Sequence, residues 1–153
     1  GFPLGACTTR AEIGEAFEPG DHLSTFGGNL VSCAAALANI DYLLESKLGD
    51  EAARKGEHVL QRLRELQQRH ELIGDVRGLG LMLGLELVKE EKLKTPASNE
   101  AAKVRELALR KGVLLGHGGV KGCTVRIQPP LVITEEQLDR TVEVIDECLR
   151  ETR

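Results

Sequence analysis

The most constraining feature of this sequence is the apolar stretch that follows Asn29, a residue type that favours the N-cap of a helix. The run LVSCAAALANIDYLLES at positions 30–46 places apolar side chains on almost every face of the helix that it predicts. A helix with no polar side must be surrounded by protein. We therefore expect this helix to need packing partners, and a chain of 153 residues supplies few of them.

Charge and hydropathy exclude several classes of partner. Lys and Arg total 20 against 24 Asp and Glu, so the net charge is -4, which offers no electrostatic footprint for nucleic acid or an anionic membrane. No run approaches the roughly 20 apolar residues of a membrane span, and the first residues do not resemble a targeting peptide. We expect a soluble, cytoplasmic protein.

The cysteines show no metal-binding spacing. Neither a CxxC pair nor a nearby ligand histidine accompanies them, so we expect no metal site. In the cytoplasm they are predicted to be reduced, small residues of the core. They are Cys7, Cys33, Cys123 and Cys148.

From residue 48 onward the periodicity predicts helices packed on a small sheet. Leucines three apart predict an amphipathic helix over 48–70. The alternation in GLGLMLGLELV predicts one strand over 78–88, with leucines on one face and glycines among the residues of the other. A further helix follows Pro96 and is closed by Gly112. This order is typical of an α/β or α+β domain in which helices cover a sheet.

The last third of the chain predicts two short strands and a helix. Val113–Leu115 and Thr124–Ile127 are strand candidates on either side of the glycine-rich link HGGVKG, and they could pair through this long loop. Thr134 and Gln137 form a capping box, which opens a final helix with a regular apolar face.

Three glycine clusters invite comparison with a phosphate-binding loop. Gly78, Gly80 and Gly84 lie inside a strand pattern, and the cluster at 116–122 lacks the ending of a P-loop, so both favour a structural role. In the third, Ser24 and Thr25 stand with two glycines directly before a helix N-terminus, where hydroxyls, amides and the helix dipole can hold an anion. An ordinary capped turn explains the same pattern.

Arg126 is the other candidate for a ligand-binding residue. It lies in the apolar segment TVRIQPPLVI, opposite in phase to Val125 and Ile127, so it points either to solvent or into a cleft. In a cleft, its planar guanidinium could bind a substrate carboxylate through two hydrogen bonds. The pattern is also that of an exposed arginine near a sheet edge. No complete set of catalytic residues is visible.

Taken together, these motifs resemble the C-terminal part of class III (omega-amino-acid) aminotransferases. The similarity implies a fold-type I transferase dependent on pyridoxal phosphate, with 1–46 as a remnant of the large cofactor domain and a connecting helix, and 47–153 as the small C-terminal domain. The motifs run from end to end in order: FPLGA at 2–6, HLSTFGGN at 22–29, CAAALA at 33–38, VRGLGLMLGLEL at 76–87 and VRIQPPLVITEEQLD at 125–139.

The resemblance also implies an activity and site residues. Members transfer an amino group to a 2-oxo acid by means of a lysine that binds the cofactor covalently, and that lysine would lie just before Gly1, so the chain by itself is expected to be inactive. Thr25 matches the threonine that reaches the cofactor phosphate of a neighbouring subunit, with Ser24 as a weaker companion. Arg126 matches the arginine that holds the carboxylate of glutamate or 2-oxoglutarate. Arg77 matches a motif that packs the small domain.

Smaller sequence features bear on the subfamily of aminotransferases that the chain resembles and on competing functions. The HGGVKG link resembles 4-aminobutyrate and alanine–glyoxylate members more than acetylornithine members, whereas Leu23 and Leu30 depart from the common family pattern. We expect amino-acid and 2-oxo-acid substrates and a homodimer or larger homo-oligomer. A non-catalytic module for dimerisation or regulation is the competing hypothesis, and an isolated domain that binds phosphate compounds through Thr25 is a third.

Overall fold

The computed structural model describes residues 2–90 and 92–152, so Gly1, Glu91 and Arg153 lie outside the described residues. The chain divides into two compact units, Gly1–Lys47 and Leu48–Arg153. The assignment of these parts to a large-domain remnant and a small domain stays a prediction.

The first unit holds two helices, α1 (Ala11–Gly14) and α2 (Leu30–Glu45). The predicted N-cap of α2 is confirmed, because the Asn29 Oδ1 atom accepts a hydrogen bond from the Ser32 backbone N–H at 3.1 Å. Among the described residues of α2 only Ser32 is buried, while Leu30 is 84% exposed. The apolar faces of α2 are therefore open, and the need for a packing partner stays a prediction.

The prediction that all four cysteines fill a core is wrong for the two in this unit. Cys7 is exposed in the segment before α1, and Cys33 is half-buried on α2, whose surface is open. Cys123 and Cys148 are buried, and all four thiols are free.

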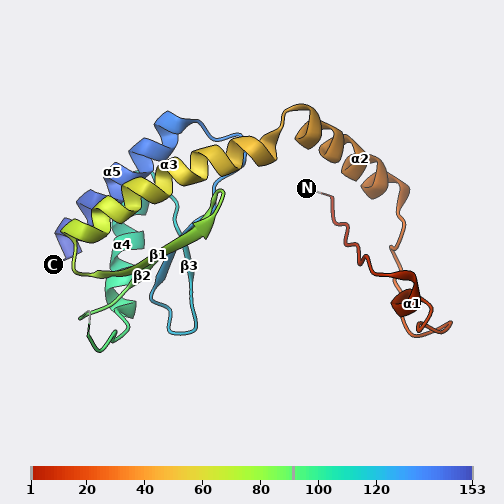
Figure 1. The fold of residues 1–153 in the computed structure, drawn as a ribbon, viewed down its shortest axis with the longest axis horizontal. Helices are drawn as coiled ribbons and strands as arrows, with labels where there is room; N and C mark the ends of the chain where they lie inside the picture. Colours follow the sequence, from red (N-terminus) through yellow and green to blue (C-terminus); the bar gives the residue numbers. More distant parts are fainter. Residues whose placement is uncertain (1, 91, 153) are drawn as a thin grey trace. The chain divides into compact units, whose positions relative to one another are not determined.

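The second unit is a small sheet covered by helices, as predicted, and all of its strand pairs are antiparallel. The strand order is β1-β2-β4-β3. Helices α3 and α4 pack against the sheet, and α5 packs against both helices (Figure 1). The elements are α3 (Leu48–Arg69), β1 (Ile73–Leu79), β2 (Met82–Leu87), α4 (Ser98–Arg110), β3 (Gly116–Gly118), β4 (Thr124–Ile127) and α5 (Glu135–Thr152).

The two faces of the sheet differ sharply. Val76, Leu85 and Val125 are partners across β1, β2 and β4, and all three are buried in the core. Because successive strand residues alternate between faces, the next row lies on the outer face. There Gly84 is paired with an arginine on each side, Arg77 on β1 and Arg126 on β4.

The single strand predicted over 78–88 is instead a hairpin. Strands β1 and β2 pair antiparallel, with Leu79 opposite Met82, so the chain reverses at Gly80 and Leu81. Gly80 has a φ of +52°, a backbone conformation that favours glycine. The leucine alternation continues in sequence through this reversal, although Leu79 is 88% exposed and Leu83 is buried.

The strand predicted at Val113–Leu115 is also misplaced, because β3 begins at Gly116. The Val113 N–H bonds to the Ala108 carbonyl at 2.9 Å, and the Gly112 N–H bonds to the Leu109 carbonyl at 3.0 Å. These are the two bonds of a Schellman cap, so this backbone completes α4 before a strand can start. The predicted closure at Gly112 is confirmed, and β4 pairs with β3 instead of with the predicted strand at Val113–Leu115.

Helix α5 is anchored at its start and along its length. The predicted capping box is confirmed, because Thr134 N–H donates to Gln137 Oε1 at 3.1 Å and Gln137 N–H donates to Thr134 Oγ1 at 3.2 Å. The carboxylate of Asp146 lies 2.6 Å from Nε2 of His70, which follows α3. None of the helices within 2–90 and 92–152 combines the length and the hydropathy that a membrane span requires.

A close approach between α3 and the hairpin generates a first prediction. A Cβ at Gly56 would lie 2.1 Å from the carbonyl oxygen of Gly80, a backbone atom that cannot swing aside. We expect Gly56→Ala to lower the free energy of unfolding by about 1–3 kcal/mol, although alanine favours a helix by about 1 kcal/mol over glycine. Urea unfolding of the purified chain measures this change.

The matched control for that experiment is Gly49→Ala in the same helix. A Cβ at Gly49 meets no atom of the described residues within 4 Å, so this variant should unfold at the same urea concentration as the wild type, or at a higher one. If both variants are as stable as the wild type, the close approach at Gly56 is wrong.

The Asp146 contact generates a second prediction. Burial raises the pKa of Asp146, but its hydrogen bond with His70 and the charges of Arg69 and Arg150 lower that pKa by more, so the net shift is downward. A carboxylate with a lowered pKa stabilises the fold above its unfolded pKa of about 3.9 and loses this effect as the pH falls through the folded pKa. We expect Asp146→Asn to be less stable than wild type at pH 7, with a difference that shrinks below about pH 4. A difference that is equal at pH 7 and pH 3 in urea unfolding would contradict this.

Candidate functional site

The first candidate site is the turn that leads into α2. Gly27 N–H bonds to the Ser24 carbonyl at 3.3 Å, and Asn29 N–H bonds to the Phe26 carbonyl at 3.1 Å. Gly28 has a φ of +70°, which a residue with a side chain rarely adopts. The turn therefore depends on its glycine and ends at the N-cap of a sixteen-residue helix.

This turn offers donors that suit an anion. Ser24 and Thr25 are adjacent and exposed, and the amide end of α2 carries partial positive charge. Ser24 borders a hollow of about 590 Å³ that is also lined by the turn glycines and by Pro3 and Gly5, whereas Thr25 does not line it. Hydroxyls and amides at a helix start are the donor set that phosphate prefers, so these residues fit a phosphate group.

The second candidate is Arg126, in the middle of β4. It is exposed between the buried residues Val125 and Ile127, so the predicted phase is confirmed, while its role stays a prediction. Its cross-strand neighbours are glycines on both sides, Gly84 on β2 and Gly116 on β3. No side chain therefore stands beside Arg126 in its own row.

The Arg126 side chain lies along β3. A Cβ at Gly116 would be 3.1 Å from Arg126 Cβ, and a Cβ at Gly118 would be 2.9 Å from Arg126 Cδ and 3.1 Å from its Nε. Neither glycine has a positive φ, so backbone conformation does not require glycine at these two positions. Because Gly116 and Gly118 have no side chains, they leave the space in which the Arg126 side chain lies.

The guanidinium of Arg126 has no carboxylate partner among the described residues, whereas Arg77 has two. Arg77 Nη1 lies 2.5 Å from Asp75 Oδ2 and 2.8 Å from Glu86 Oε2. Hydrogen bonds to Asp75 and then Glu86 raise the pKa of Arg77. The charge of Arg77 is thus balanced within the fold, and Arg126 remains available to a carboxylate from outside.

The predicted site residues fall in both units. Ser24 and Thr25 share one turn, and Arg126 belongs to the sheet of the second unit. The sequence alone does not predict Asp75 and Glu86 as neighbours of an arginine site. The sequence does contain the opposite charges of Asp75, Arg77 and Glu86. They indicate ion pairs only once β1 is recognised as a strand that pairs with β2.

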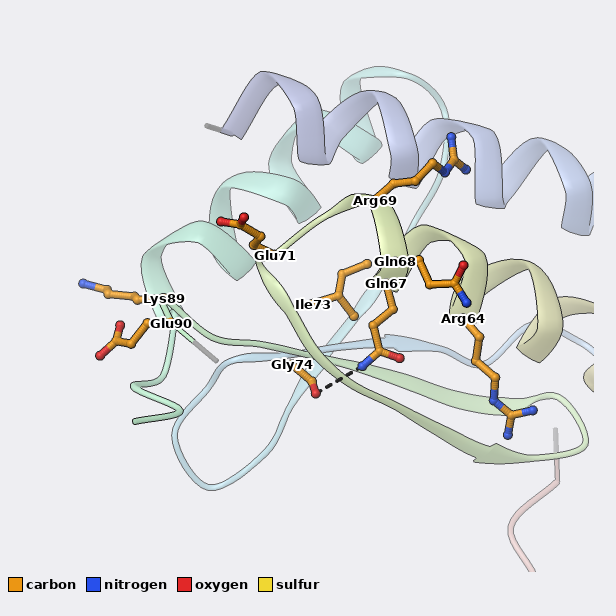
Figure 2. A pocket seen from close by; sticks show the side chains of 9 residues that line it. All are labelled: Arg64, Gln67, Gln68, Arg69, Glu71, Ile73, Gly74, Lys89 and Glu90. Carbon is orange, nitrogen blue, oxygen red and sulfur yellow. Dashed lines mark hydrogen bonds between the residues drawn. The ribbon is translucent and has the colours of Figure 1, made fainter. Parts of the chain in front are cut away.

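A large hollow elsewhere does not have the arrangement of a ligand site. This hollow has a volume of about 980 Å³ and lies beside the end of α3. Figure 2 shows that the side chains around it diverge. Gln67 donates to the Gly74 carbonyl at 3.2 Å, Arg69 points towards α5, and Lys89 and Glu90 point outward. A small-molecule site needs polar groups that converge. The lining residues are Arg64, Gln67, Gln68, Arg69, Glu71, Ile73, Gly74, Lys89 and Glu90.

Comparison with protein families assigns the chain. The family model described as Aminotransferase class-III matches residues 1–149. The chain therefore belongs to the class III aminotransferase family, and the resemblance inferred from its motifs is confirmed.

Individual relatives differ in their named reactions. The chain is 45% identical over 146 residues to "Alanine--glyoxylate aminotransferase 2 homolog 2, mitochondrial" of Arabidopsis thaliana, covering 95% of this chain and 31% of that protein. It is 42% identical to "Isoleucine 2-epimerase" of Lentilactobacillus buchneri, covering 97% of this chain and 32% of the relative. The chain thus spans about a third of the length of these relatives.

Solved structures agree with the fold. A Bacillus anthracis aminotransferase superimposes with a TM-score of 0.85 at 31% identity, covering 93% of this chain and 34% of that one. An amine transaminase from an uncultivated Pseudomonas species, solved in its PLP-bound form, gives a TM-score of 0.79 at 30% identity over 87% of this chain and 30% of that one. The predicted fold, that of a transferase dependent on pyridoxal phosphate, is confirmed.

Proposed function

We propose that this chain is the C-terminal segment of an aminotransferase that moves an amino group from an omega-amino acid, similar to 4-aminobutyrate, to a 2-oxo acid such as 2-oxoglutarate. The observation that carries the proposal is the exposed guanidinium of Arg126, which has no carboxylate partner among the described residues. In the proposed aminotransferase, the planar guanidinium of Arg126 binds and orients the carboxylate of the acid substrate.

The proposed cofactor is pyridoxal phosphate, which supplies the electron sink for the transfer when it is bound. In this chain, the hydroxyls of Thr25 and Ser24 donate hydrogen bonds to its phosphate, and the amide end of α2 adds favourable charge. We propose by family resemblance that Thr25 reaches the cofactor of a neighbouring subunit, and therefore that the protein is a homodimer or a larger homo-oligomer. The open apolar faces of α2 are consistent with further packing partners.

The catalytic amine is proposed to lie outside this chain. A lysine that attacks a carbonyl needs a lowered pKa so that its amine is uncharged. Lys111 shows the opposite, since hydrogen bonds to Glu147 and Glu151 raise its pKa. Lys55 is also engaged, because its Nζ donates to the Ile133 carbonyl at 2.8 Å. We assign no catalytic residue within the chain, and we assign residues 1–46 to the large cofactor domain and 47–153 to the small domain.

The proposal that the catalytic amine lies outside this chain generates a third prediction. The purified 153-residue chain, mixed with pyridoxal phosphate and then borohydride, should show no modification concentrated on one lysine and no transfer of an amino group. Mass spectrometry of the digested chain and an amino-acid assay give the two readouts. Stoichiometric trapping on a single lysine together with turnover would overturn the proposal.

A fourth prediction separates the two binding roles in the full-length gene product that carries this chain. Arg126→Lys replaces a planar fork by a point charge, so the KM for 2-oxoglutarate should rise about tenfold while pyridoxal phosphate stays bound. Thr25→Val removes one charged hydrogen bond, so the dissociation constant of the cofactor should rise about tenfold. Steady-state kinetics and cofactor absorbance after dialysis measure the two effects.

Each variant of this pair is the control for the other. If Arg126→Lys loses cofactor as readily as 2-oxoglutarate affinity, the carboxylate role is wrong. If Thr25→Val retains the cofactor as the wild type does, the phosphate role is wrong.

A second candidate function, amino-acid epimerisation, is supported by the similarity to an isoleucine 2-epimerase. Such a reaction also requires that a carboxylate be held, so Arg126 suits both reactions. The assay that separates them supplies L-isoleucine without any 2-oxo acid. Inversion at Cα under these conditions supports the epimerase, whereas a strict requirement for a 2-oxo acid supports the aminotransferase.

A further inference from the structure

The outer face of the sheet places one glutamate within reach of two arginines. Gly84 is paired with Arg77 on one side and with Arg126 on the other. Glu86 lies two residues further along β2, on the same face, so it is a diagonal cross-strand neighbour of both arginines. Such diagonal neighbours are about 7–8 Å apart, which long side chains can bridge.

Of these two diagonal contacts, the structure contains only one. Glu86 Oε2 lies 2.8 Å from Arg77 Nη1. The same Nη1 atom lies 2.5 Å from Asp75, so Arg77 is held between two carboxylates. Arg126 instead lies over the glycines of β3, on the side away from β2. The carboxylate that could occupy Arg126 is therefore held by Arg77.

We propose that Arg77 is a positioning residue, which by holding Glu86 keeps the guanidinium of Arg126 free for the substrate carboxylate. This inference rests on the proposed role of Arg126. Without Arg77, Glu86 would become an internal carboxylate that competes with the substrate for the same guanidinium. Gly116 and Gly118 support the arrangement, because side chains there would collide with Arg126 in its position along β3.

The test uses the full-length gene product loaded with pyridoxal phosphate. Arg77→Met should raise the KM for 2-oxoglutarate about threefold to fivefold, the size of one exposed ion pair, with little change in kcat. The dissociation constant of glutarate, a diacid that cannot react, should rise by the same factor. This second readout reports binding alone.

The decisive arm is rescue. Adding Glu86→Gln to Arg77→Met removes the competing carboxylate, so both constants should return to the wild-type values. Arg64→Met is the matched control, because Arg64 is exposed to a similar degree (56% against 52%) and lies 3.9 Å from a glutamate on α3. It should change neither constant.

A second variant, on β3, tests the same competition between Glu86 and the substrate for Arg126. Gly118→Ala places a Cβ 2.9 Å from Arg126 Cδ and should raise both constants, again with rescue by Glu86→Gln. Gly49→Ala is its control, since Gly49 lies on α3 and a Cβ there meets no atom of the described residues within 4 Å. This arm keeps the test open if Arg77→Met does not fold.

The outcomes separate this inference from the proposed function. If Arg126→Lys raises the KM for 2-oxoglutarate but Glu86→Gln rescues neither Arg77→Met nor Gly118→Ala, Arg77 acts through packing and the inference is wrong. Unchanged constants in Arg77→Met also overturn it. If Arg126→Lys leaves the KM unchanged, the proposed function fails and the inference fails with it.

Discussion

The packing of one face of the sheet against α3 and α4 is the constraint on which the rest of the structure depends. Leu83 and Leu85 of β2 and Val125 of β4 are buried on that face. A shift of one residue would turn these side chains to the outside, so their burial sets the strand register. The register in turn places Gly84 between Arg77 and Arg126 on the other face. The geometry of the candidate carboxylate site is thus a consequence of core packing.

Much of this fold could be predicted from local sequence signals. The helical period anticipated α3 and α5, and the cap residues Asn29, Thr134 and Gly112 act as their types suggest. The hairpin was missed because leucines alternate straight through the reversal at Gly80. A tertiary contact also holds the turn there, since Gly80 packs on Gly56 of α3, twenty-four residues earlier in the sequence. No local pattern contains that contact.

The candidate sites divide in the same way. The phase of Arg126 followed from the alternation of its strand, and the Ser24–Thr25 turn followed from residue types before an N-cap. The roles of these residues come from family resemblance, because a bare arginine or hydroxyl does not specify its ligand. The pairing of Glu86 with Arg77 instead of Arg126 depends on cross-strand register and on the glycines of β3. Sequence alone provides neither.

The most direct test of the account is a crystal structure of the full-length gene product with pyridoxal phosphate and glutarate bound. We expect a glutarate carboxylate to accept two hydrogen bonds from the Arg126 guanidinium, the Thr25 hydroxyl to donate to the cofactor phosphate, and Glu86 to stay on Arg77. Glutarate held by other residues, with Arg126 facing solvent or paired with Glu86, would contradict it.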